Sequence, residues 1–489
     1  MMLIAYNTGP CRGYLIVDLN GDLTGDESEN ERMNPQELAT CHCIIAHPAK
    51  AKFLVVQHAD RWSTPFIRLP AAGPMALKAK LITDTVRDAY GLRTTALRQW
   101  LSTPNYHCVE LELASEAATR RLKAVWVGRA EYRKFRNPAL QDADPFDAWL
   151  RQRESGDAVP LRPWERPGWL RRASGWLQHE LDRHAIQVTG SVEQHTAFRH
   201  ASSVLRVPTA DGYYYLKAGL PQPPREAPLT GALAARWPDW VPKPLAVNAA
   251  ENWMLSGDYR AGAEELAFAD YPAIAGGLAA LQAASAVDLE PWLALGCPKV
   301  GMAQLLAFVL EPDALNDVLG EGGGIALGEP DLARLQARAA DWPSRCQALA
   351  ELGLPDTLVH ADLWYANLQR RPGGYWITDW SGAVVGQPFF ALLKLLRYRA
   401  LWQPGQPSLP AAEAGGDALA EAIEARYLQA FTGIHGERRL REGLAQARGL
   451  EGAWRLLKWK RALDFEAPGS FAYQRVARKL QQIARELIA

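Results

Sequence analysis

The sequence has 489 residues, which is longer than one ordinary hydrophobic core requires and indicates two or three domains. A hydrophobic fraction of 48% and a charged fraction of 22% are typical of a globular protein and exclude a disordered chain. Lys plus Arg and Asp plus Glu each number 54, so no overall basic field favours nucleic acid as a partner.

No apolar run reaches the roughly 18–20 residues that a membrane-spanning helix needs. The N-terminus lacks the basic start, apolar stretch and cleavage site of a secretory signal. We therefore expect a cytoplasmic protein with no membrane partner. The six cysteines are sparse and irregularly spaced, which predicts reduced and mostly buried thiols. Cys41 and Cys43 should point to one face of a strand, and without a second Cys/His pair we expect no zinc there.

Residues 1–150 are predicted to form a domain that mixes strands and helices. The strand-like runs are "CHCIIAHP", "KFLVVQHA", "CVELELA" and "KAVWVGRA". The segment "MALKAKLITDTVRDAYGL" between them has apolar residues at helical spacing and ends at Gly91, a helix-stop residue.

Residues 151–185 are predicted to connect this domain to the rest of the chain. The polar, proline-bearing stretch 151–165 has the composition of a linker. The amphipathic segment "PGWLRRASGWLQHELDRHAI" that follows predicts a helix that braces the next domain.

Residues 186–258 return to a strand-rich pattern. "SSVLRVPTADGYYYLKAG" predicts two strands joined at "ADG", "REAPLTGALAARWP" predicts a helix, and "KPLAVNAAENWMLSGD" predicts a second strand pair. From residue 259 to 489 the pattern is almost entirely helical. The glycine-rich "GEGGG" at 320–324 lacks a preceding strand and a following helix, which favours a surface loop over a phosphate cradle.

The stretch "VHADLWYANL" carries the residues with the clearest chemical meaning. Phosphoryl transfer needs a carboxylate for the proton of the attacking hydroxyl, two oxygen ligands for Mg²⁺ and a lysine for the phosphates. Asp362 and Asn367 lie five residues apart, and His360 is placed to bond the backbone of their loop. Asp379 follows twelve residues after Asn367, at the end of the predicted strand "YWIT". One such Asp alone is usually structural, but the joint pattern is specific.

"HADLWYAN" followed by "WITDW" resembles the catalytic and metal-binding loops of the aminoglycoside phosphotransferase and choline kinase-like family. The resemblance covers roughly residues 186–489 and implies a bilobal protein-kinase-like fold, with a small β-rich N-lobe at 186–258 and a large helical C-lobe at 259–489. It implies that Asp362 is the catalytic base, that Asn367 and Asp379 hold Mg²⁺, and that His360 is structural. The cofactors it implies are ATP or GTP with Mg²⁺, and the partner is a small-molecule hydroxyl acceptor.

The upstream half matches what a kinase N-lobe needs, namely a phosphate-contacting lysine on a strand and a glutamate on the following helix. Lys217 ends "YYYLK", and Glu226 opens the next predicted helix. The remaining nucleotide-binding residues predicted here are Ser202 and Ser203 over the phosphates, and Leu255 to Gly257 beside the adenine.

The chain also departs from the family pattern. The family commonly shows G-x-P-x-x-D-L after the second aspartate, and "GQPFFALL" places Ala391 where that aspartate would stand. The family's "L-x-x-L-H" helix motif is only approximated by "LAALQAAS". These differences bear on local geometry more than on the chemistry.

The helix predicted near residues 75–92 is similar to the Nudix hydrolase helix, aligned on Gly91 and Leu92. The positions that should read Arg, Glu, Glu and Glu carry Asp84, Thr85, Asp88 and Ala89. Nudix chemistry needs several glutamates to hold metal against a pyrophosphate, so we expect a degenerate, non-hydrolytic Nudix-like α/β domain. Binding, homodimer formation and covering of the kinase cleft are the roles left open for it.

Residues 437–489 carry twelve Lys or Arg against six Asp or Glu, which does not suit a polycationic aminoglycoside. A solvated basic helix face explains this composition, and a neutral, anionic or partly aromatic acceptor is the other interpretation. An ATP-dependent phosphotransferase is the principal hypothesis. The alternative is a non-catalytic nucleotide-binding scaffold, a pseudokinase beside a pseudo-Nudix domain. A protein kinase is disfavoured, because the sequence has no G-x-G-x-x-G, D-F-G or A-P-E segment.

Overall fold

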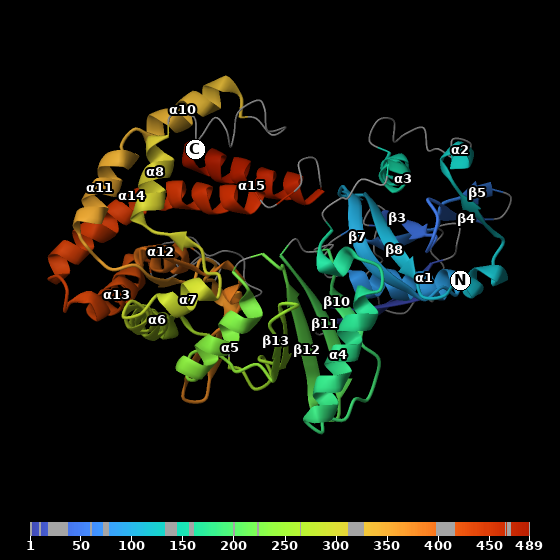
Figure 1. Cartoon of the computed structure of the whole chain (residues 1–489), viewed down its shortest axis with the longest axis horizontal. Coiled ribbons are helices and arrows are strands. Elements are labelled where there is room, and N and C mark those ends of the chain that lie inside the picture. Colours follow the sequence, from blue (N-terminus) through green and yellow to red (C-terminus); the bar gives the residue numbers. More distant parts are fainter. Residues whose placement is uncertain are drawn as a thin grey trace. The chain divides into compact units, whose positions relative to one another are not determined.

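The computed structural model describes the following residues: 2–8, 11–17, 38–58, 61–71, 78–132, 144–155, 161–198, 201–222, 224–264, 266–311, 327–397, 416–464, 466 and 471–488. The chain divides into two compact units, Met1–Lys217 and Ala218–Ala489 (Figure 1). Both contain helices and strands, which confirms the mixed α+β class. Within the described ranges, no helix is long and apolar enough to span a bilayer. The segment 320–324 lies outside them.

The first unit is built on a seven-stranded sheet in the order β5-β4-β3-β8-β7, with β6 also paired to β3 and β9 to β4. Strands β3 and β8 run parallel, and the other pairs are antiparallel. The four predicted strands correspond to β3, β4, β8 and β9. The bounds of the sheet strands are β3 (Leu38–Ala46), β4 (Phe53–His58), β5 (Arg61–Ser63), β6 (Phe66–Pro70), β7 (Thr94–Ser102), β8 (Tyr106–Leu113) and β9 (Ala124–Val127).

A helix covers each face of this sheet, because successive residues of a strand point to opposite faces. Cys41 and Cys43 of β3 pack in the cluster that includes the apolar side of α1 (Ala79–Tyr90). Their neighbour Ile44 packs in the opposite cluster, with residues of α3 (Pro145–Ser155). The prediction that the two cysteines share a face is confirmed, and the five cysteines whose side chains are described are reduced and buried.

Helix α1 stops where the sequence predicts. Gly91 adopts the left-handed conformation at φ 68° and donates its N–H to the carbonyl of Arg87. The predicted linker is partly wrong, because α3 continues through Ser155 and so occupies the first five residues of 151–165. The apolar residues that α3 buries all lie before residue 151. The polar composition of 151–155 by itself therefore indicates a linker and not the end of a helix. The helix predicted after the linker is found as α4 (Trp169–Arg183), and its bracing of the next domain stays a prediction.

Three further strands end the first unit, in the order β10-β11-β12. The predicted "ADG" hairpin corresponds to β11 and β12. The bounds of these and the remaining elements of the unit are β1 (Met2–Thr8), β2 (Cys11–Val17), η3 (Glu116–Arg121), α2 (Arg129–Tyr132), η5 (Pro163–Glu165), β10 (Glu193–Thr196), β11 (Ser202–Thr209) and β12 (Gly212–Gly219).

The second unit begins with α5 (Glu226–Arg236) and the antiparallel pair β13 (Ala246–Asn248) and β14 (Trp253–Gly257), as predicted. The rest is mainly helical. Its helices are α6 (Tyr271–Ser285), α7 (Glu290–Ala294), α8 (Met302–Leu310), α10 (Glu329–Ala339), α11 (Trp342–Glu351), α12 (Phe389–Arg397), α13 (Gly416–Leu428), α14 (Glu437–Leu463) and α15 (Phe471–Ile488), with the short turns η6 (Phe268–Asp270), η8 (Tyr365–Asn367), η9 (Trp380–Gly382) and η11 (Gln429–Phe431).

Within the described part of the second unit, five short strands interrupt these helices, and the sequence does not predict four of them. Each has two to four residues, too few for an alternating pattern to stand out. They are β15 (Lys299–Val300), β16 (Thr357–Val359), β17 (Leu368–Arg371), β18 (Gly374–Ile377) and β19 (Val384–Gly386). The predicted strand "YWIT" is confirmed as β18.

Helix α14 runs through the helical core, where it packs on α11 and lies beside α15 (Figure 1). Gly452 permits this contact, because a Cβ added there would lie 2.4 Å from a methyl carbon of Leu487. Helix α6 packs on α13. Lys458 of α14 donates to the carbonyl of Ala361, so this helix also reaches the segment between β16 and α12, where the candidate site lies.

Candidate active site

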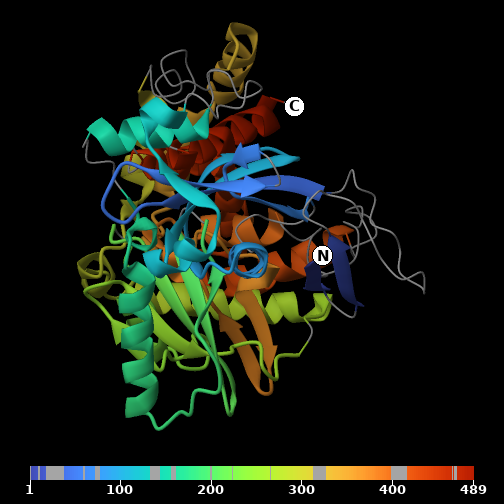
Figure 2. The same ribbon diagram turned by 90° about the vertical axis from the view of Figure 1, so that its right-hand side faces the viewer.

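The predicted catalytic and metal-binding residues lie in the second unit, between the loop-side end of the strand pair β16 and β19 and the base of the inner hairpin β17 and β18. Strands β16 and β19 pair antiparallel, with Val359 opposite Val384. Between them, β17 and β18 form an inner hairpin with Leu368 opposite Ile377, drawn as a pair of orange strands in Figure 2. His360 follows β16, Asn367 precedes β17 and Asp379 follows β18, so strand pairing brings these chain positions together.

His360 links the two sides of this arrangement. Its Nδ1 accepts a hydrogen bond from the N–H of Asp362 at 3.3 Å, so the proton must be on Nε2. Nε2 donates that proton to the carbonyl of Thr378 at 3.0 Å. The ring is buried and packs edge-on against Trp380, with centroids 4.6 Å apart. Burial lowers the pKa of His360, which keeps the ring neutral and its tautomer fixed.

Asn367 holds the end of the 360–367 loop that lies opposite His360. Its side-chain amide nitrogen donates to the carbonyl of Asp362 at 2.9 Å. Its own carbonyl accepts the N–H of Thr378, also at 2.9 Å. The nitrogen end of the amide is thus committed to the backbone, and the oxygen end is the one that could serve a cation.

Asp379 has an unusual backbone conformation, φ 64° and ψ 63°, in the left-handed region that L-residues seldom occupy. The hydroxyl of Ser381 donates to its Oδ1 at 2.6 Å. Strain of this kind persists only where surrounding contacts fix the backbone, and it is frequent at functional sites. The buried Trp380, whose Nε1 donates to the carbonyl of Ile377, supplies such a contact.

Two lysines from distant helices meet the loop at Asp362. Lys394 of α12 lies 3.1 Å from Oδ1 of Asp362. Lys458 of α14 donates to the carbonyl of Ala361 at 2.7 Å. Burial alone would raise the pKa of Asp362, but Lys458 and Lys394 outweigh it and hold that pKa below its usual value. Asp362 is therefore an ionised hydrogen-bond acceptor at neutral pH.

The pKa of Lys458 is lowered to about 8, mainly by burial, while Asp362 and Asp379 oppose this shift and Lys394 and Arg455 add to it. Lys458 still carries its charge at pH 7 for the most part. The sequence analysis did not identify either lysine. A signal existed for Lys458, since it continues the buried positions Leu450 and Trp454 at helical spacing.

Gln282 is a third residue that the sequence analysis did not single out. It stands in "LAALQAAS", where the family motif has histidine, and it is fully buried on α6. Its amide nitrogen donates to Oγ1 of Thr357 at 3.2 Å and to the carbonyl of Pro388 at 3.3 Å, and its oxygen accepts from the hydroxyl of Tyr427 at 2.6 Å. Gln282 thus joins the strand before the site to the start of α12. Ala391, at the departure from the family pattern, is buried one turn before Lys394.

The remaining predicted residues of the second unit lie on other elements. Glu226 is buried at the first turn of α5. Leu255 is buried in β14, and its carbonyl accepts the N–H of Leu245 at 2.8 Å. Gly257 ends that strand. Their predicted roles in nucleotide binding stay predictions.

Three predicted residues belong to the first unit. Ser202 and Ser203 begin β11, and both are buried. The hydroxyl of Ser203 donates to the carbonyl of Thr196 at 2.8 Å, which uses its proton within the sheet. Lys217 lies on β12 at the end of the unit. The roles of these three residues also stay predictions.

The donors of Asn367 and Asp379 suit Mg²⁺, since an amide oxygen and a carboxylate are the hard oxygen ligands that this ion prefers. Their backbones are tied side by side through the Thr378 N–H bond to Asn367. Among the described residues, no group of three or more His, Cys, Asp and Glu side chains could hold a metal by itself. A site of two protein ligands completed by phosphate oxygens fits this donor set.

In comparisons with known proteins, no family model and no curated protein matches the chain. Several solved structures are similar to it. A choline/ethanolamine kinase family protein from Mesorhizobium loti is 18% identical, with a TM-score of 0.37 over 62% of this chain and 89% of that one. An ethanolamine kinase from Plasmodium vivax is 9% identical, with a TM-score of 0.41 over 70% and 95%. A spectinomycin phosphotransferase in complex with ADP and spectinomycin is 9% identical, with a TM-score of 0.40 over 65% and 98%.

Proposed function

We propose that this chain is a phosphotransferase that moves the γ-phosphoryl group of ATP or GTP to a hydroxyl of a small molecule. The observation that carries the proposal is the pairing of β16 with β19 and of β17 with β18, together with the hydrogen bonds of Asn367, which holds the segments of Asp362, Asn367 and Asp379 side by side. His360, neutral and bonded on both ring nitrogens, fixes the two sides of the arrangement to each other.

In the proposed reaction, Asp362 accepts a hydrogen bond from the acceptor hydroxyl and orients its oxygen toward the γ-phosphorus. A bond forms between that oxygen and phosphorus, and the bond from phosphorus to the β,γ-bridging oxygen breaks. The hydroxyl proton passes to the carboxylate of Asp362 and then to solvent. A carboxylate with a low pKa suits this role, because the hydroxyl loses its proton late in a loose transition state.

Asn367 and Asp379 are the residues that would hold Mg²⁺, which neutralises charge on the phosphates when bound. Ser381 orients the Asp379 carboxylate, and the Asn367 amide is oriented by its bond to the carbonyl of Asp362. The proposal includes the bilobal kinase-like architecture over residues 186–489. It assigns Lys217, Glu226, Ser202, Ser203 and the Leu255 to Gly257 segment to nucleotide binding.

The test is Asp362→Asn in the full chain, assayed for turnover of Mg-ATP and for binding of a fluorescent ATP analogue. We expect turnover to fall by about 10³-fold while nucleotide binding stays close to wild type, since general-base groups contribute roughly 10²–10⁴-fold. Asp356→Asn, six residues upstream and at the end of β16 that lies away from His360, is the matched control. A scaffold that only binds nucleotide would show the same slow turnover in wild type, Asp362→Asn and control.

We also propose that residues 1–150, within the first unit, form a Nudix-like domain without hydrolase activity. What supports this is the state of the two remaining acidic positions of α1. Asp84 pairs with Lys80 and Arg87, and Asp88 pairs with Arg87, so bases of the same helix neutralise both carboxylates. Hydrolysis of nucleoside diphosphate-linked compounds by the full chain, lost in Asp84→Asn, would contradict it.

A further inference from the structure

The chain that leads into β11 is part of the hydrophobic core around the seven-stranded sheet. Ala197 and Phe198 follow β10 and are only 1% and 7% exposed. Both belong to the apolar cluster that contains Cys41 and Cys43 of β3 and the buried side of α1. Residues of the predicted kinase N-lobe, 186–258, therefore contribute to the core of the domain predicted to be Nudix-like.

Gln194 of β10 makes the most specific connection to that sheet. Its side chain is buried, its amide oxygen accepts the N–H of Ala96 at 2.8 Å, and its amide nitrogen donates to the carbonyl of Ala96 at 2.9 Å. Ala96 lies on β7, 98 positions away in sequence. A single side chain thus satisfies both backbone groups of a buried strand residue, as a neighbouring strand would.

Thr196 extends this connection from β10 to the start of β11. Its Oγ1 accepts the N–H of Val204 at 3.0 Å, and its carbonyl accepts the hydroxyl of Ser203 at 2.8 Å. The pairing of β10 with β11 shifts in register between Gln194 and Thr196, and both of these side chains are buried. Hydrogen bonds therefore lead from β7, through β10, to the first residues of β11.

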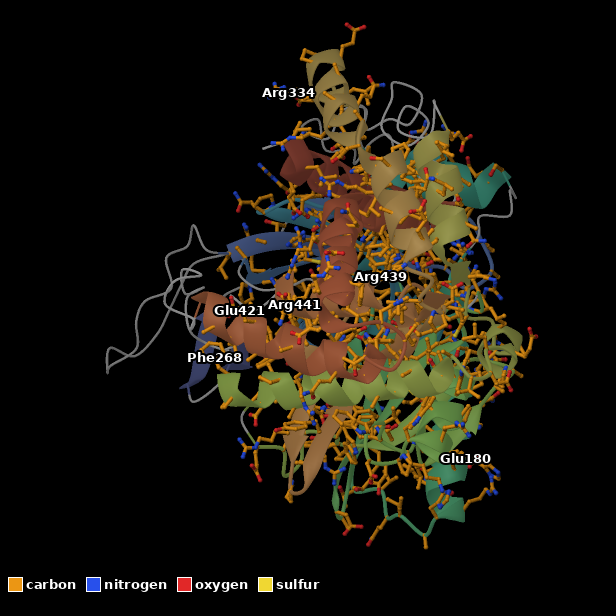
Figure 3. The ribbon with its side chains drawn as sticks, turned by 90° about the vertical axis from the view of Figure 1, so that its left-hand side faces the viewer. Glu180, Phe268, Arg334, Glu421, Arg439 and Arg441 are labelled. Carbon is orange, nitrogen blue, oxygen red and sulfur yellow. The ribbon has the colours of Figure 1, made fainter. Side chains whose placement is uncertain are left out.

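Helix α4 provides a second connection between the same sheet and β11. The N–H of Gly168, the residue before α4, donates to both carboxylate oxygens of Glu112 on β8, at 2.8 and 3.0 Å. The helix carries Glu180, which is labelled in Figure 3. After it, the N–H of Thr189 donates to the carbonyl of Pro208, near the end of β11, at 3.0 Å. Both ends of β11 are thus connected to strands of the seven-stranded sheet.

Charged side chains follow the same path. Lys80 of α1 lies 3.4 Å from Glu193 of β10, and Glu193 pairs with Arg206 of β11 at 2.7 Å. Partly exposed ion pairs contribute little to stability, so these pairs accompany the buried contacts and do not replace them. The buried amide of Gln194 is the contact whose loss should matter most.

We propose that the Nudix-like domain holds the phosphate-binding strands β11 and β12 in position, and that Gln194 is the positioning residue that attaches them. This inference rests on the proposed phosphotransfer, because it takes Ser202, Ser203 and Lys217 as the residues of these strands that meet the phosphates. All three belong to the same compact unit as the seven-stranded sheet, whereas Leu255 to Gly257, proposed beside the base, belong to the other. Gln194 should therefore affect recognition of the phosphates and not of the base.

The physical basis is an equilibrium between attached and detached β10. Without the Gln194 amide, the N–H and carbonyl of Ala96 regain hydrogen bonds when water reaches them, which requires β10 to move away from β7. The apparent affinity for a ligand falls in proportion to the fraction of molecules that can bind it. Adenosine has no phosphates, so its affinity should not depend on the attached fraction.

The test compares Gln194→Leu with wild type in the full chain, because leucine fills much of the same space and removes both bonds. Titration with adenosine and with Mg-ADP measures the two affinities, and steady-state turnover gives kcat and the KM for Mg-ATP. Guanosine and its nucleotides replace these probes if the wild type prefers GTP. We expect the Kd of Mg-ADP and the KM for Mg-ATP to rise by about 10-fold, as for an attached fraction of about one tenth. The Kd of adenosine should stay at its wild-type value, and kcat should as well, because saturating nucleotide selects the attached form.

Tyr132→Phe is the matched control for a general loss of stability. The Tyr132 hydroxyl bonds both carboxylate oxygens of the buried Asp144, and its ring packs in the cluster on the face of the sheet opposite α1. We expect this variant to melt at a lower temperature and to bind Mg-ADP like wild type. Should Gln194→Leu misfold, Thr196→Val tests the same path, because it keeps the shape of the side chain and removes the bond to the Val204 N–H.

The outcomes separate the two proposals. Wild-type affinity for Mg-ADP in Gln194→Leu, or in Thr196→Val where that variant takes its place, overturns the positioning role while phosphotransfer stands. Equal losses of affinity for adenosine and Mg-ADP also overturn it, and so does a loss in Tyr132→Phe as large as in Gln194→Leu, because the effect would then be general. If the wild type binds neither Mg-ADP nor Mg-GDP, phosphotransfer itself fails and this inference fails with it.

Discussion

Nε2 of His360 and the carbonyl oxygen of Thr378 lie 3.0 Å apart, and this hydrogen bond joins the segment that carries Asp362 to the segment that carries Asp379. The two residues are 18 positions apart in sequence and belong to opposite sides of the nested hairpins. A neutral ring with both nitrogens bonded holds that spacing without adding charge to the site.

Replacing this ring should loosen the site. His360→Ala leaves the Thr378 carbonyl and the Asp362 N–H without their partner, at a cost of about 3 kcal/mol in the free energy of unfolding. A displacement of about 1 Å in the catalytic group lowers kcat by roughly 10²-fold. Thermal unfolding and steady-state ATP turnover measure the two effects.

His435→Ala is the matched control. Nε2 of His435 also bonds a carbonyl oxygen, that of Leu352, but this bond lies outside the segment between β16 and β19. We expect it to lower stability with little change in kcat. Equal losses of kcat in both variants would mean that His360 acts only through overall stability.

Two substitutions of Asp379 separate the effect of its backbone strain on stability from the effect of its carboxylate on metal binding. Asp379→Gly and Asp379→Ala both remove the carboxylate, so both should abolish Mg²⁺-dependent turnover. Only glycine adopts φ 64° without a Cβ penalty, so the glycine variant should be more stable than the alanine variant by about 1 kcal/mol. Chemical unfolding of the two proteins measures this difference, and equal stabilities would show that the strain is relieved elsewhere.

Gln282 should contribute to stability rather than to chemistry. Gln282→Leu keeps the volume but leaves the Thr357 hydroxyl and the Pro388 carbonyl with one partner fewer, at a cost of about 2 kcal/mol. Unfolding midpoints in urea measure the loss. Well below the unfolding transition, kcat should match wild type; a large fall in kcat would instead show that the start of α12 controls the site.

Acid should destabilise the first unit through two histidines, the buried His107 and the half-buried His42. Burial and Arg68 lower the pKa of His42 to about 4, and burial and Lys78 lower that of His107 to about 4. Between about pH 6.5 and 4 the unfolded chain binds protons that the folded unit does not. Their contribution to stability is complete above pH 6.5 and is lost as the pH falls toward 4.

Melting curves between pH 7.5 and 4.5 check this dependence. His107→Gln should flatten it, whereas His184→Gln, at an exposed residue after α4, should leave it unchanged. An unchanged slope in His107→Gln would show that other groups cause the acid sensitivity.

The sequence predicted those parts of the molecule that local patterns encode. The helix that ends at Gly91, the "ADG" hairpin and the strand before Asp379 all follow from neighbouring residues and were found as predicted. The spacing of His360, Asp362 and Asn367 likewise identified one loop. The sequence analysis did not identify Lys394 and Lys458, because their contacts with the loop depend on how α12 and α14 pack; the helical spacing of Lys458 from Leu450 and Trp454 was the one local signal. The strand β16 was not predicted, because three residues are too few to show an alternation of apolar and polar side chains.

The nesting of β16 to β19 has a consequence for folding. The carboxylates and the amide of the site come from one short stretch of chain, so they can assemble by closing small loops, which is fast. Lys458 joins them from a helix 97 residues away from Ala361, and its loop closure is slower. The segments of Asp362, Asn367 and Asp379 are therefore expected to come together early in folding. The later packing of α14 brings Lys458 to them and completes the site.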